Sequence, residues 1–346
     1  MSNATSNNMS SEKAADQGHN IQDSSPFTPS AHRRSRKKYV PSAPLGPNDA
    51  IGEGDSRIIY DLNLPSDAFE LIRDEVKWQK MYHLSGEVPR LVAVQGAVQP
   101  DNSIPIYRHP ADESPPLLSF TKTVDVLREA VEKILGHPLN HVLIQLYRDG
   151  QDRISEHSDK TLDIVRGSYI CNVSLGAERV MTLRTKVSAK AEKQADSNVA
   201  KDSDPERQSQ RVPLPHNSLF ILGENTNKVW LHGIRPDKRP ESTKTPEELA
   251  FNGQRISLTF RNIGTFINPE ADTIWGQGAV SKTKENAQEV IHGECVETEG
   301  MIRAFGQENQ RNDFNWDANY GRGFNVVNFV TKASPKLSPS EDQQSS

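Results

Sequence analysis

His157 and Asp159 are the residues whose types and spacing first indicate chemistry. They lie in "HVLIQLYRDGQDRISEHSDK" at residues 141–160, where an apolar run stops at an Asp-Gly pair and a charged stretch follows. If the chain stays extended there, the imidazole and the carboxylate point to the same side, because side chains alternate along a strand. They would then form two parts of the two-histidine, one-carboxylate triad that binds Fe(II) and leaves open coordination positions.

The His-x-acid pattern is also typical of a solvated loop after a turn, and the sequence "HGE" at 292–294 repeats it. A metal site needs a further histidine. His232 in "KVWLHGIRP" is the best placed, because it follows an apolar strand candidate; the alternatives are a core histidine bonded to a carbonyl, or a turn residue. His216 in "LPHNS" is the competitor, although this segment is typical of a turn that leads into a strand.

A second feature is the alternating strand candidate "RISLTFR" at 255–261. Its apolar residues share one face, and its polar residues share the other. The polar set is Arg255, Ser257, Thr259 and Arg261. An ordinary half-buried strand would turn both arginines to water, whereas a barrel with a polar interior would aim them inward to bind a dicarboxylate through charge-assisted hydrogen bonds. The preceding His157 and Asp159 favour the inward orientation.

Several short strands must position these residues. The candidates are rich in β-branched and aromatic residues and end at Gly, Pro, Asn or Asp. They lie at 141–147, 168–176, 178–184, 218–223, 228–234 and 255–261. This spacing is typical of a sandwich or barrel, and helices precede the strands, so we predict an α+β fold with a β core.

The predicted helices follow a short strand at 58–60. The first is capped by Ser66, with Phe69, Ile72 and Val76 on one face. The second spans 120–136 and ends at Gly136. Its apolar face is formed by Val124, Leu127, Val131 and Ile134.

Composition divides the chain into a folded part and polar segments. We predict a disordered N-terminal tail at 1–56 and a folded domain at 57–268 with a disordered insert at 186–211. An extension at 269–332 is expected to pack on the core, and a disordered tail is expected at 333–346. The aromatic-rich "FNWDANYGRGFNVVNF" in the extension is interpreted as core packing; a stacking platform for bases is the alternative.

Charge and cysteine content restrict the class of protein. The net charge of −5 is not that of a protein that holds nucleic acid mainly through its phosphates, although a local basic patch is compatible with it. Cys171 and Cys295 are too few for a disulfide scaffold. We expect no signal peptide and no membrane span, hence an intracellular location in nucleus or cytoplasm. The basic cluster at 33–38 is a candidate nuclear import signal.

The ordered set of motifs resembles the AlkB family of Fe(II)- and 2-oxoglutarate-dependent dioxygenases over about residues 85–266. The motifs are "LIQLYRDG", "HSD", "SLGAER", "LPHNSLFILG", "WLHGIRP" and "RISLTFR". The resemblance implies a double-stranded β-helix (jelly roll) core with N-terminal helices. It also implies Fe(II), 2-oxoglutarate and O2 as cofactor and co-substrates.

Carried across residue by residue, the resemblance implies that His157, Asp159 and His232 hold the iron. Arg255 would pair with the distal carboxylate of 2-oxoglutarate, and Arg261 would lie near its iron-chelating end. Tyr147 and, as a weaker assignment, Gln145 would hydrogen-bond the co-substrate.

The chain departs from the family pattern at three places, which concern the co-substrate contact, the substrate and the access to the site. Gln145 stands where the family usually has Asn. Thr161 stands two residues after Asp159, where base-repairing members usually carry an acid close to the flipped base. The span between His232 and Arg255 is longer, which predicts an added surface loop at 233–254.

The favoured expectation is therefore oxidative demethylation of N-alkylated bases in DNA or RNA by a monomer, with a role in DNA repair. The products are succinate, CO2 and formaldehyde. The alternative is the same oxygenase chemistry on a small metabolite or a protein side chain, which needs no phosphate-binding face. A third hypothesis is a non-catalytic binding module that keeps the fold. The sequence leaves the substrate and the role of 269–332 open.

Overall fold

The computed structural model describes residues 43–83, 86–110, 113–187, 207–293, 295–327 and 330–331. The basic cluster at 33–38, the tail at 333–346 and most of the insert at 186–211 lie outside these ranges. Among the described residues, no helix has both the length and the apolar character needed to cross a membrane.

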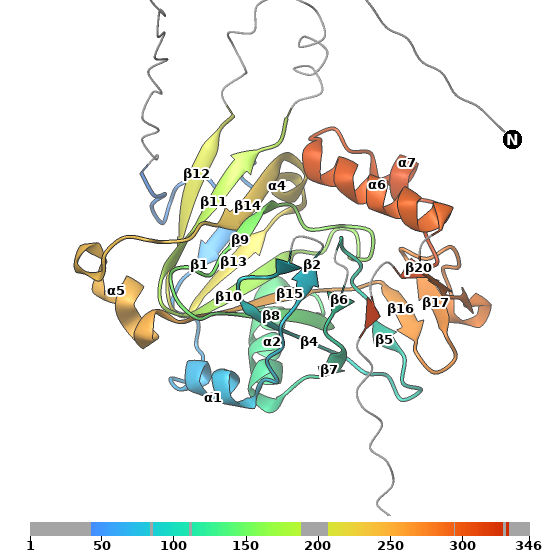
Figure 1. Ribbon diagram of the computed structural model, residues 1–346, viewed down its shortest axis with the longest axis horizontal. Coiled ribbons are helices and arrows are strands. Elements are labelled where there is room, and N and C mark those ends of the chain that lie inside the picture. Colours follow the sequence, from blue (N-terminus) through green and yellow to red (C-terminus); the bar gives the residue numbers. More distant parts are fainter. Residues whose placement is uncertain are drawn as a thin grey trace, which may run out of the picture. The chain divides into compact units, whose positions relative to one another are not determined.

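The core consists of two facing sheets (Figure 1). The larger sheet has the strand order β1-β13-β10-β15-β8-β4-β7, and the smaller has β12-β11-β14-β9. In the larger sheet the bounds are β1 Arg57–Ile59, β4 Leu91–Gly96, β7 Leu117–Ser119, β8 His141–Tyr147, β10 Ile170–Gly176, β13 Ser218–Leu222 and β15 Arg255–Arg261. In the smaller they are β9 Ile154–His157, β11 Arg179–Thr185, β12 Ser209–Leu214 and β14 Trp230–Ile234. Apolar side chains from both sheets share one cluster, so the predicted α+β jelly roll is confirmed.

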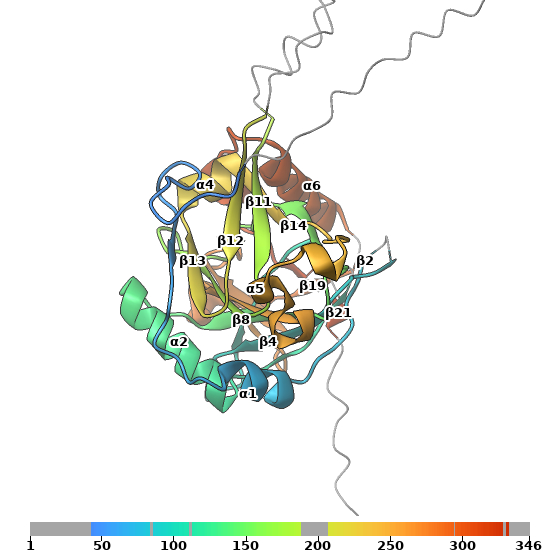
Figure 2. The same ribbon diagram turned by 90° about the vertical axis from the view of Figure 1, so that its left-hand side faces the viewer.

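Two helices cover the outer face of the larger sheet (Figure 2). They are α1 (Ala68–Glu75) and α2 (Lys122–Leu135). Phe260 and the other apolar residues of β15 point into the cluster beneath these helices, whereas the polar residues of β15 face the smaller sheet. The predicted alternation of β15 is therefore confirmed, and Gly136 ends α2 in the left-handed conformation with a φ of 75°.

Two helix details were predicted wrongly. The residue before α1 is Asp67 and not Ser66, because Leu71 N–H donates to the Asp67 carbonyl in the first helical turn. Ile134 is 37% exposed. The buried stripe of α2 reaches Leu135 instead, four residues after Val131, where the helical turn brings the side chain back over the sheet.

Several ordered segments were not predicted. The strands β4, β9 and β12 complete the two sheets, and the helix α4 (Glu224–Val229) occupies the start of the strand candidate 228–234. Both ends of the predicted insert are ordered, since Lys186 is buried and residues 209–211 belong to β12. Packed structure also begins before residue 57, since Ile51 is buried and bridges to Ser56.

The segment 269–327 contacts the core through a buried ion pair and an apolar cluster. Arg108 and Asp163 pair at 2.6 Å with both side chains fully buried, and Arg108 also donates to the carbonyls of Phe324 and Gly278. Leu162 packs against Met301 and its neighbours. The main helices here are α6 (Val296–Gln310) and α7 (Trp316–Tyr320). The aromatic rings of Phe314 and Trp316 pack against Tyr320, which agrees with the core-packing interpretation.

The remaining elements are short. A third sheet has the order β18-β17-β16-β5, with bounds Gln288–Glu289, Thr273–Gly276, Thr265–Asn268 and Ile104–Pro105. Three two-stranded pairs join β2 Tyr82–His83 to β3 Gly86–Glu87, β6 Glu113–Ser114 to β21 Val330–Thr331, and β19 Ile291–His292 to β20 Val326–Val327. The predicted added loop 233–254 contains η1 Glu241–Thr243, α5 Pro246–Leu249 and η2 Ala250–Gly253, while η3 Lys284–Asn286 lies later.

Candidate metal centre

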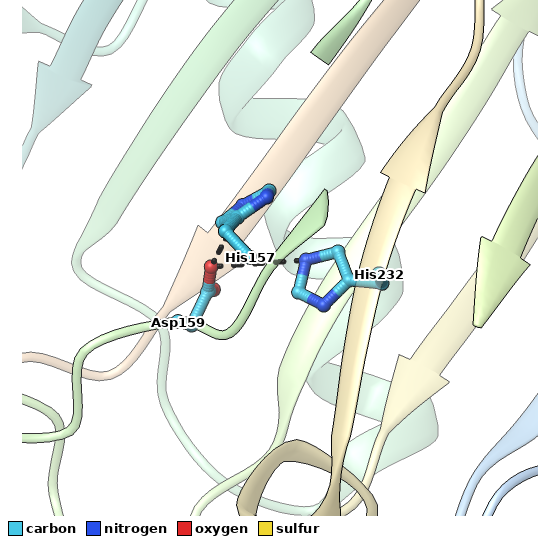
Figure 3. A group of neighbouring side chains, drawn as sticks. All are labelled: His157, Asp159 and His232. Carbon is cyan, nitrogen blue, oxygen red and sulfur yellow. Dashed lines mark ion pairs between the residues drawn. The ribbon is translucent and has the colours of Figure 1, made fainter. Parts of the chain in front are cut away.

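Two imidazoles and one carboxylate gather beside the adjacent strands β14 and β9 of the smaller sheet (Figure 3). His157 ends β9, Asp159 lies in the loop that follows, and His232 lies in β14 directly opposite His157. Each residue offers one ligand atom, and these atoms all lie within 4.8 Å of one another. The structure therefore brings together the three residues that the sequence singles out.

The two histidines are arranged as neutral ligands. Nδ1 of His157 lies 2.8 Å from the carbonyl oxygen of Ser155. This oxygen can only accept a hydrogen bond, so Nδ1 carries the proton and Nε2 keeps its lone pair. Burial lowers the pKa of His157, and burial together with the neighbouring His157 lowers the pKa of His232 to about 3.

The carboxylate is held in its ionised form by an arginine. Burial alone would raise the pKa of Asp159, but the charge of Arg261 and then the two imidazoles lower it well below its usual value. Arg261 donates through Nε and Nη2 to Asp159 Oδ2, at 3.2 Å and 2.8 Å. Oδ1 faces the histidines, at 3.7 Å from His157 Nε2 and 3.9 Å from His232 Nε2. The guanidinium of Arg261 stacks 4.1 Å above the ring of Tyr107.

A cavity between the two sheets contains every predicted site residue. Its lining includes His157, Asp159, His232, Gln145, Tyr147, Arg255 and Arg261. Apolar side chains such as Met181 and Phe220 close the remainder of the wall. A polar patch surrounded by apolar walls is typical of a site for a small ligand.

Arg255 is a buried cation that is only partly satisfied by the protein. Its Nη2 donates to Asn172 Oδ1 at 3.1 Å and to Ser174 Oγ at 2.7 Å. Among the described residues, Nε and Nη1 have no hydrogen-bond partner. Burial lowers the pKa of Arg255 to about 10, so the guanidinium still carries its charge at neutral pH. An anion in the cavity would supply the missing acceptors.

Tyr147 and Gln145 lie on β8, opposite Arg255 and Ser257 of β15. The Tyr147 ring lies 5.2 Å from the guanidinium carbon of Arg255. The Gln145 side-chain carbonyl accepts from Arg90 Nε, so this oxygen already has a partner. The predicted contact between Gln145 and the co-substrate therefore concerns the side-chain NH2 group alone, and it stays a prediction.

The competing histidines lie elsewhere. His216 Nδ1 accepts from the Gly176 N–H at 3.0 Å, and its ring stacks on Phe251. His292, from the second His-x-acid match, is 61% exposed and pairs with Asp272 at 2.7 Å. Neither belongs to the cluster of His157, Asp159 and His232.

Two supporting residues were missed by sequence reasoning. Asn227 accepts from the Asp159 N–H and donates to the Asp159 carbonyl, at 2.9 Å and 3.0 Å. Arg90 positions Gln145 and also donates to the Arg153 carbonyl at 2.9 Å. Both come from segments distant in sequence, and the pattern around them carries no signal of such a role.

The donor set fits a divalent transition metal. Two neutral imidazole nitrogens and one carboxylate oxygen are the ligands of the facial triad that non-haem Fe(II) adopts, and this set leaves further coordination positions free. The unpaired nitrogens of Arg255 lie in the same cavity, which fits an anionic co-substrate beside the metal.

Comparisons with known proteins agree with this chemistry. The family model described as the 2OG-Fe(II) oxygenase superfamily matches residues 63–261. The DNA oxidative demethylase ALKBH2 of Bos taurus is 32% identical over 139 residues, which are 40% of this chain and 42% of that protein. The Alpha-ketoglutarate-dependent dioxygenase alkB homolog 3 of Bos taurus is 27% identical over 207 residues, 59% of this chain and 63% of that protein.

Both matches span less than two thirds of the relative's own length. Among solved structures, that of OsALKBH1 aligns with a TM-score of 0.39 and 13% sequence identity. The alignment covers 60% of this chain and 96% of that one.

Proposed function

The chain belongs to the 2OG-Fe(II) oxygenase superfamily, and from this premise we propose that it is an Fe(II)- and 2-oxoglutarate-dependent dioxygenase that demethylates N-alkylated bases in DNA or RNA. The observation that carries the proposal is the cluster of His157, Asp159 and His232 in one cavity with a buried, half-satisfied guanidinium. This combination suits a metal and an anionic co-substrate bound side by side.

His157, Asp159 and His232 would hold the iron. Because both imidazoles are neutral and the carboxylate is ionised, no ligand has to lose a proton before the metal binds at neutral pH. Bound Fe(II) supplies the activation of dioxygen, which couples decarboxylation of 2-oxoglutarate to hydroxylation of the substrate. Arg261 keeps Asp159 ionised and fixes its orientation through Oδ2.

Arg255 would bind the distal carboxylate of 2-oxoglutarate. Its Nε and Nη1 are the buried donors that an anion in the cavity can satisfy, and Asn172 and Ser174 hold the third nitrogen in place. Tyr147 lines the same wall and carries a hydroxyl that can donate to the co-substrate. The apolar lining excludes water from the reacting groups.

The reaction balances as 2-oxoglutarate, O2 and an N-methyl group giving succinate, CO2 and an N-hydroxymethyl group. The N-hydroxymethyl group then releases formaldehyde and leaves the bare nitrogen. A methylated nucleobase is supported as substrate by the relatives, one of which is named as a DNA oxidative demethylase. We propose a location in the nucleus or the cytoplasm, where DNA and RNA occur.

The experiment incubates the full-length protein with Fe(II), 2-oxoglutarate and N-methylated oligonucleotides, both DNA and RNA, single- and double-stranded. Succinate, formaldehyde and the unmodified base are measured by mass spectrometry. His157→Ala is the inactive variant. His292→Ala is the matched control, because His292 has the same His-x-acid context but lies outside the cluster.

The expected result is equimolar succinate and formaldehyde from at least one oligonucleotide, lost in His157→Ala and kept in His292→Ala. Succinate without formaldehyde from any oligonucleotide would contradict the nucleic-acid substrate and favour a small metabolite or a protein side chain. Absence of both succinate formation and metal binding in the wild type would contradict the dioxygenase itself.

A further inference from the structure

The loop that carries Asp159 is buried without being part of a sheet. It follows β9, and residues 158–161 belong to no helix or strand. Ser158, Asp159 and Lys160 are each less than 5% exposed. Buried backbone N–H groups need acceptors, and a strand neighbour does not provide them here.

Side chains from distant parts of the sequence accept hydrogen bonds from the N–H groups of all four residues, 158–161. Ser158 donates to Asn309 Oδ1 at 2.9 Å, Asp159 to Asn227 Oδ1 at 2.9 Å, Lys160 to the Tyr107 hydroxyl at 3.1 Å, and Thr161 to Glu308 Oε1 at 3.0 Å. The backbone on both sides of the proposed iron ligand is thus fixed by side chains that are distant in sequence.

The helix α6 provides two of the four acceptors, at the first and last positions of the loop. Its C-terminal turn lies close to α4 in Figure 1. Asn309 Oδ1 also accepts from Lys160 Nζ at 3.2 Å. Glu308 is 4% exposed, and its second carboxylate oxygen accepts from the Tyr320 hydroxyl at 2.7 Å.

The backbone carbonyl of Glu308 makes a further hydrogen bond that connects α6 to α4. It accepts from Lys186 Nζ at 2.7 Å, and the same ammonium group donates to the Asn227 carbonyl at 3.0 Å. Because Asn227 in turn holds both backbone groups of Asp159, α6 and α4 are joined behind the loop. The helix α6 lies outside residues 63–261, which the family model matches, and it contacts the loop behind the proposed iron site.

We propose that Asn309 and Glu308 of α6 are positioning residues for the metal centre, which hold the loop 158–161 so that Asp159 faces His157 and His232. The inference rests on the proposed function and deepens it, since it assigns a role to the C-terminal segment. Residues that orient metal ligands from behind typically change metal affinity when they are replaced.

The test measures the affinity of the metal-free protein for Co(II), whose visible d–d absorption reports its ligand set. Asn309→Ala removes the acceptor for Ser158 and Lys160. Asn309→Leu removes it too but fills the space, so it replaces the alanine variant if that variant does not fold. Asn309→Asp keeps an acceptor oxygen. Gln307→Ala is the matched control, because Gln307 is exposed on the same helical turn.

Thermal unfolding in the presence of EDTA checks that each variant is folded without metal. The expected result is a Co(II) Kd about 10-fold higher or more for Asn309→Ala or Asn309→Leu, with an altered d–d spectrum. Asn309→Asp and Gln307→Ala are expected within about threefold of the wild type, because they keep the loop contacts.

Two results would overturn the proposal. One is a folded Asn309→Ala or Asn309→Leu protein with the Kd and spectrum of the wild type. The other is Asn309→Asp binding as weakly as Asn309→Ala, which would mean that the acceptor is not what matters. Failure of the wild type itself to bind Co(II), or equal binding by His157→Ala, would instead overturn the proposed metal centre.

Discussion

Arg261 and Asp159 form a buried pair in which Nη2 of the arginine lies 2.8 Å from Oδ2 of the aspartate. The pairing leaves Oδ1 facing the two imidazoles and keeps the carboxylate ionised. It links the strand that carries Arg255 to the loop that carries the proposed iron ligand.

The first prediction concerns stability. Arg261→Met leaves the buried Asp159 without its cation, so the free energy of unfolding of the metal-free protein is expected to fall by about 3–5 kcal/mol. Arg239→Met is the control, because Arg239 pairs with Asp237 at the surface, and a change below about 1 kcal/mol is expected. Urea unfolding measures both. Equal effects of the two substitutions would contradict the assigned burial and pairing.

The second prediction separates co-substrate binding from metal binding. Arg255→Met removes the guanidinium whose Nε and Nη1 have no protein acceptor in the described part of the chain, so the Kd for 2-oxoglutarate is expected to rise about 100-fold. The Co(II) affinity is expected to stay unchanged, since Arg255 does not belong to the metal cluster. Arg73→Met, at the surface, is the control. Calorimetric titration of the Co(II)-loaded proteins measures the effect, and an unchanged Kd for 2-oxoglutarate would refute the role of Arg255.

The third prediction concerns pH. The pKa of His232 is about 3 in the folded, metal-free protein and about 6.5 in the unfolded chain. The unfolded chain therefore takes up a proton below pH 6.5 that the folded state does not, and stability falls as the pH falls. From pH 6.5 to 5, His232 is expected to contribute a loss of about 1.5 kcal/mol.

Urea unfolding of the wild type and His232→Gln at several pH values measures this contribution. The variant is expected to lose less stability than the wild type over that interval, because it lacks the titrating imidazole. A parallel pH dependence in both proteins would show that His232 is not buried in its neutral form.

The fourth prediction tests the assignment of faces around β15. Leu258→Ala is expected to lower the free energy of unfolding by about 2–5 kcal/mol, because Leu258 is fully buried between the larger sheet and its helices. Ile134→Ala is expected to change it by less than about 1 kcal/mol, since Ile134 is 37% exposed at the end of α2. A reversed order of the two effects would contradict the observed packing.

The sequence predicted those parts of the site that depend on local periodicity. The alternation in "RISLTFR" predicted that Arg255 and Arg261 share a face, and the short spacing of His157 and Asp159 predicted that they share a side. The residues around His232 also identified its strand. The shared face of Arg255 and Arg261 follows from the period of two in β15, which can be recognised from a few residues. Asp159 lies beyond the end of β9, so its side-chain direction depends on the loop contacts as well.

The supporting shell could not be predicted in the same way. Asn227, Asn309 and Glu308 reach the loop of Asp159 only because α4 and α6 pack beside it, and that packing depends on contacts far apart in sequence. The helix α4 itself depends on a contact with a residue distant in sequence. The Asp55 carboxylate accepts from the N–H of Asn225 and of Thr226, which caps a segment of poor helix formers.

Position 161 is a further example of a contact that the local sequence does not predict. Thr161 stands there in place of the acid expected from the family pattern. In the structure, the Thr161 hydroxyl donates to the Glu308 carboxylate, so an acidic group lies next to this position although none stands there in the sequence. No pattern within residues 157–161 indicates a partner 147 residues downstream.

The most direct measurement for the account is a crystal structure of the full-length protein grown without oxygen with Mn(II) and 2-oxoglutarate, with anomalous data collected for manganese. The account predicts one strong anomalous peak bonded to Nε2 of His157, Oδ1 of Asp159 and Nε2 of His232, with the distal carboxylate of 2-oxoglutarate on Arg255. A peak at any other group of residues, or 2-oxoglutarate bound away from Arg255, would contradict it.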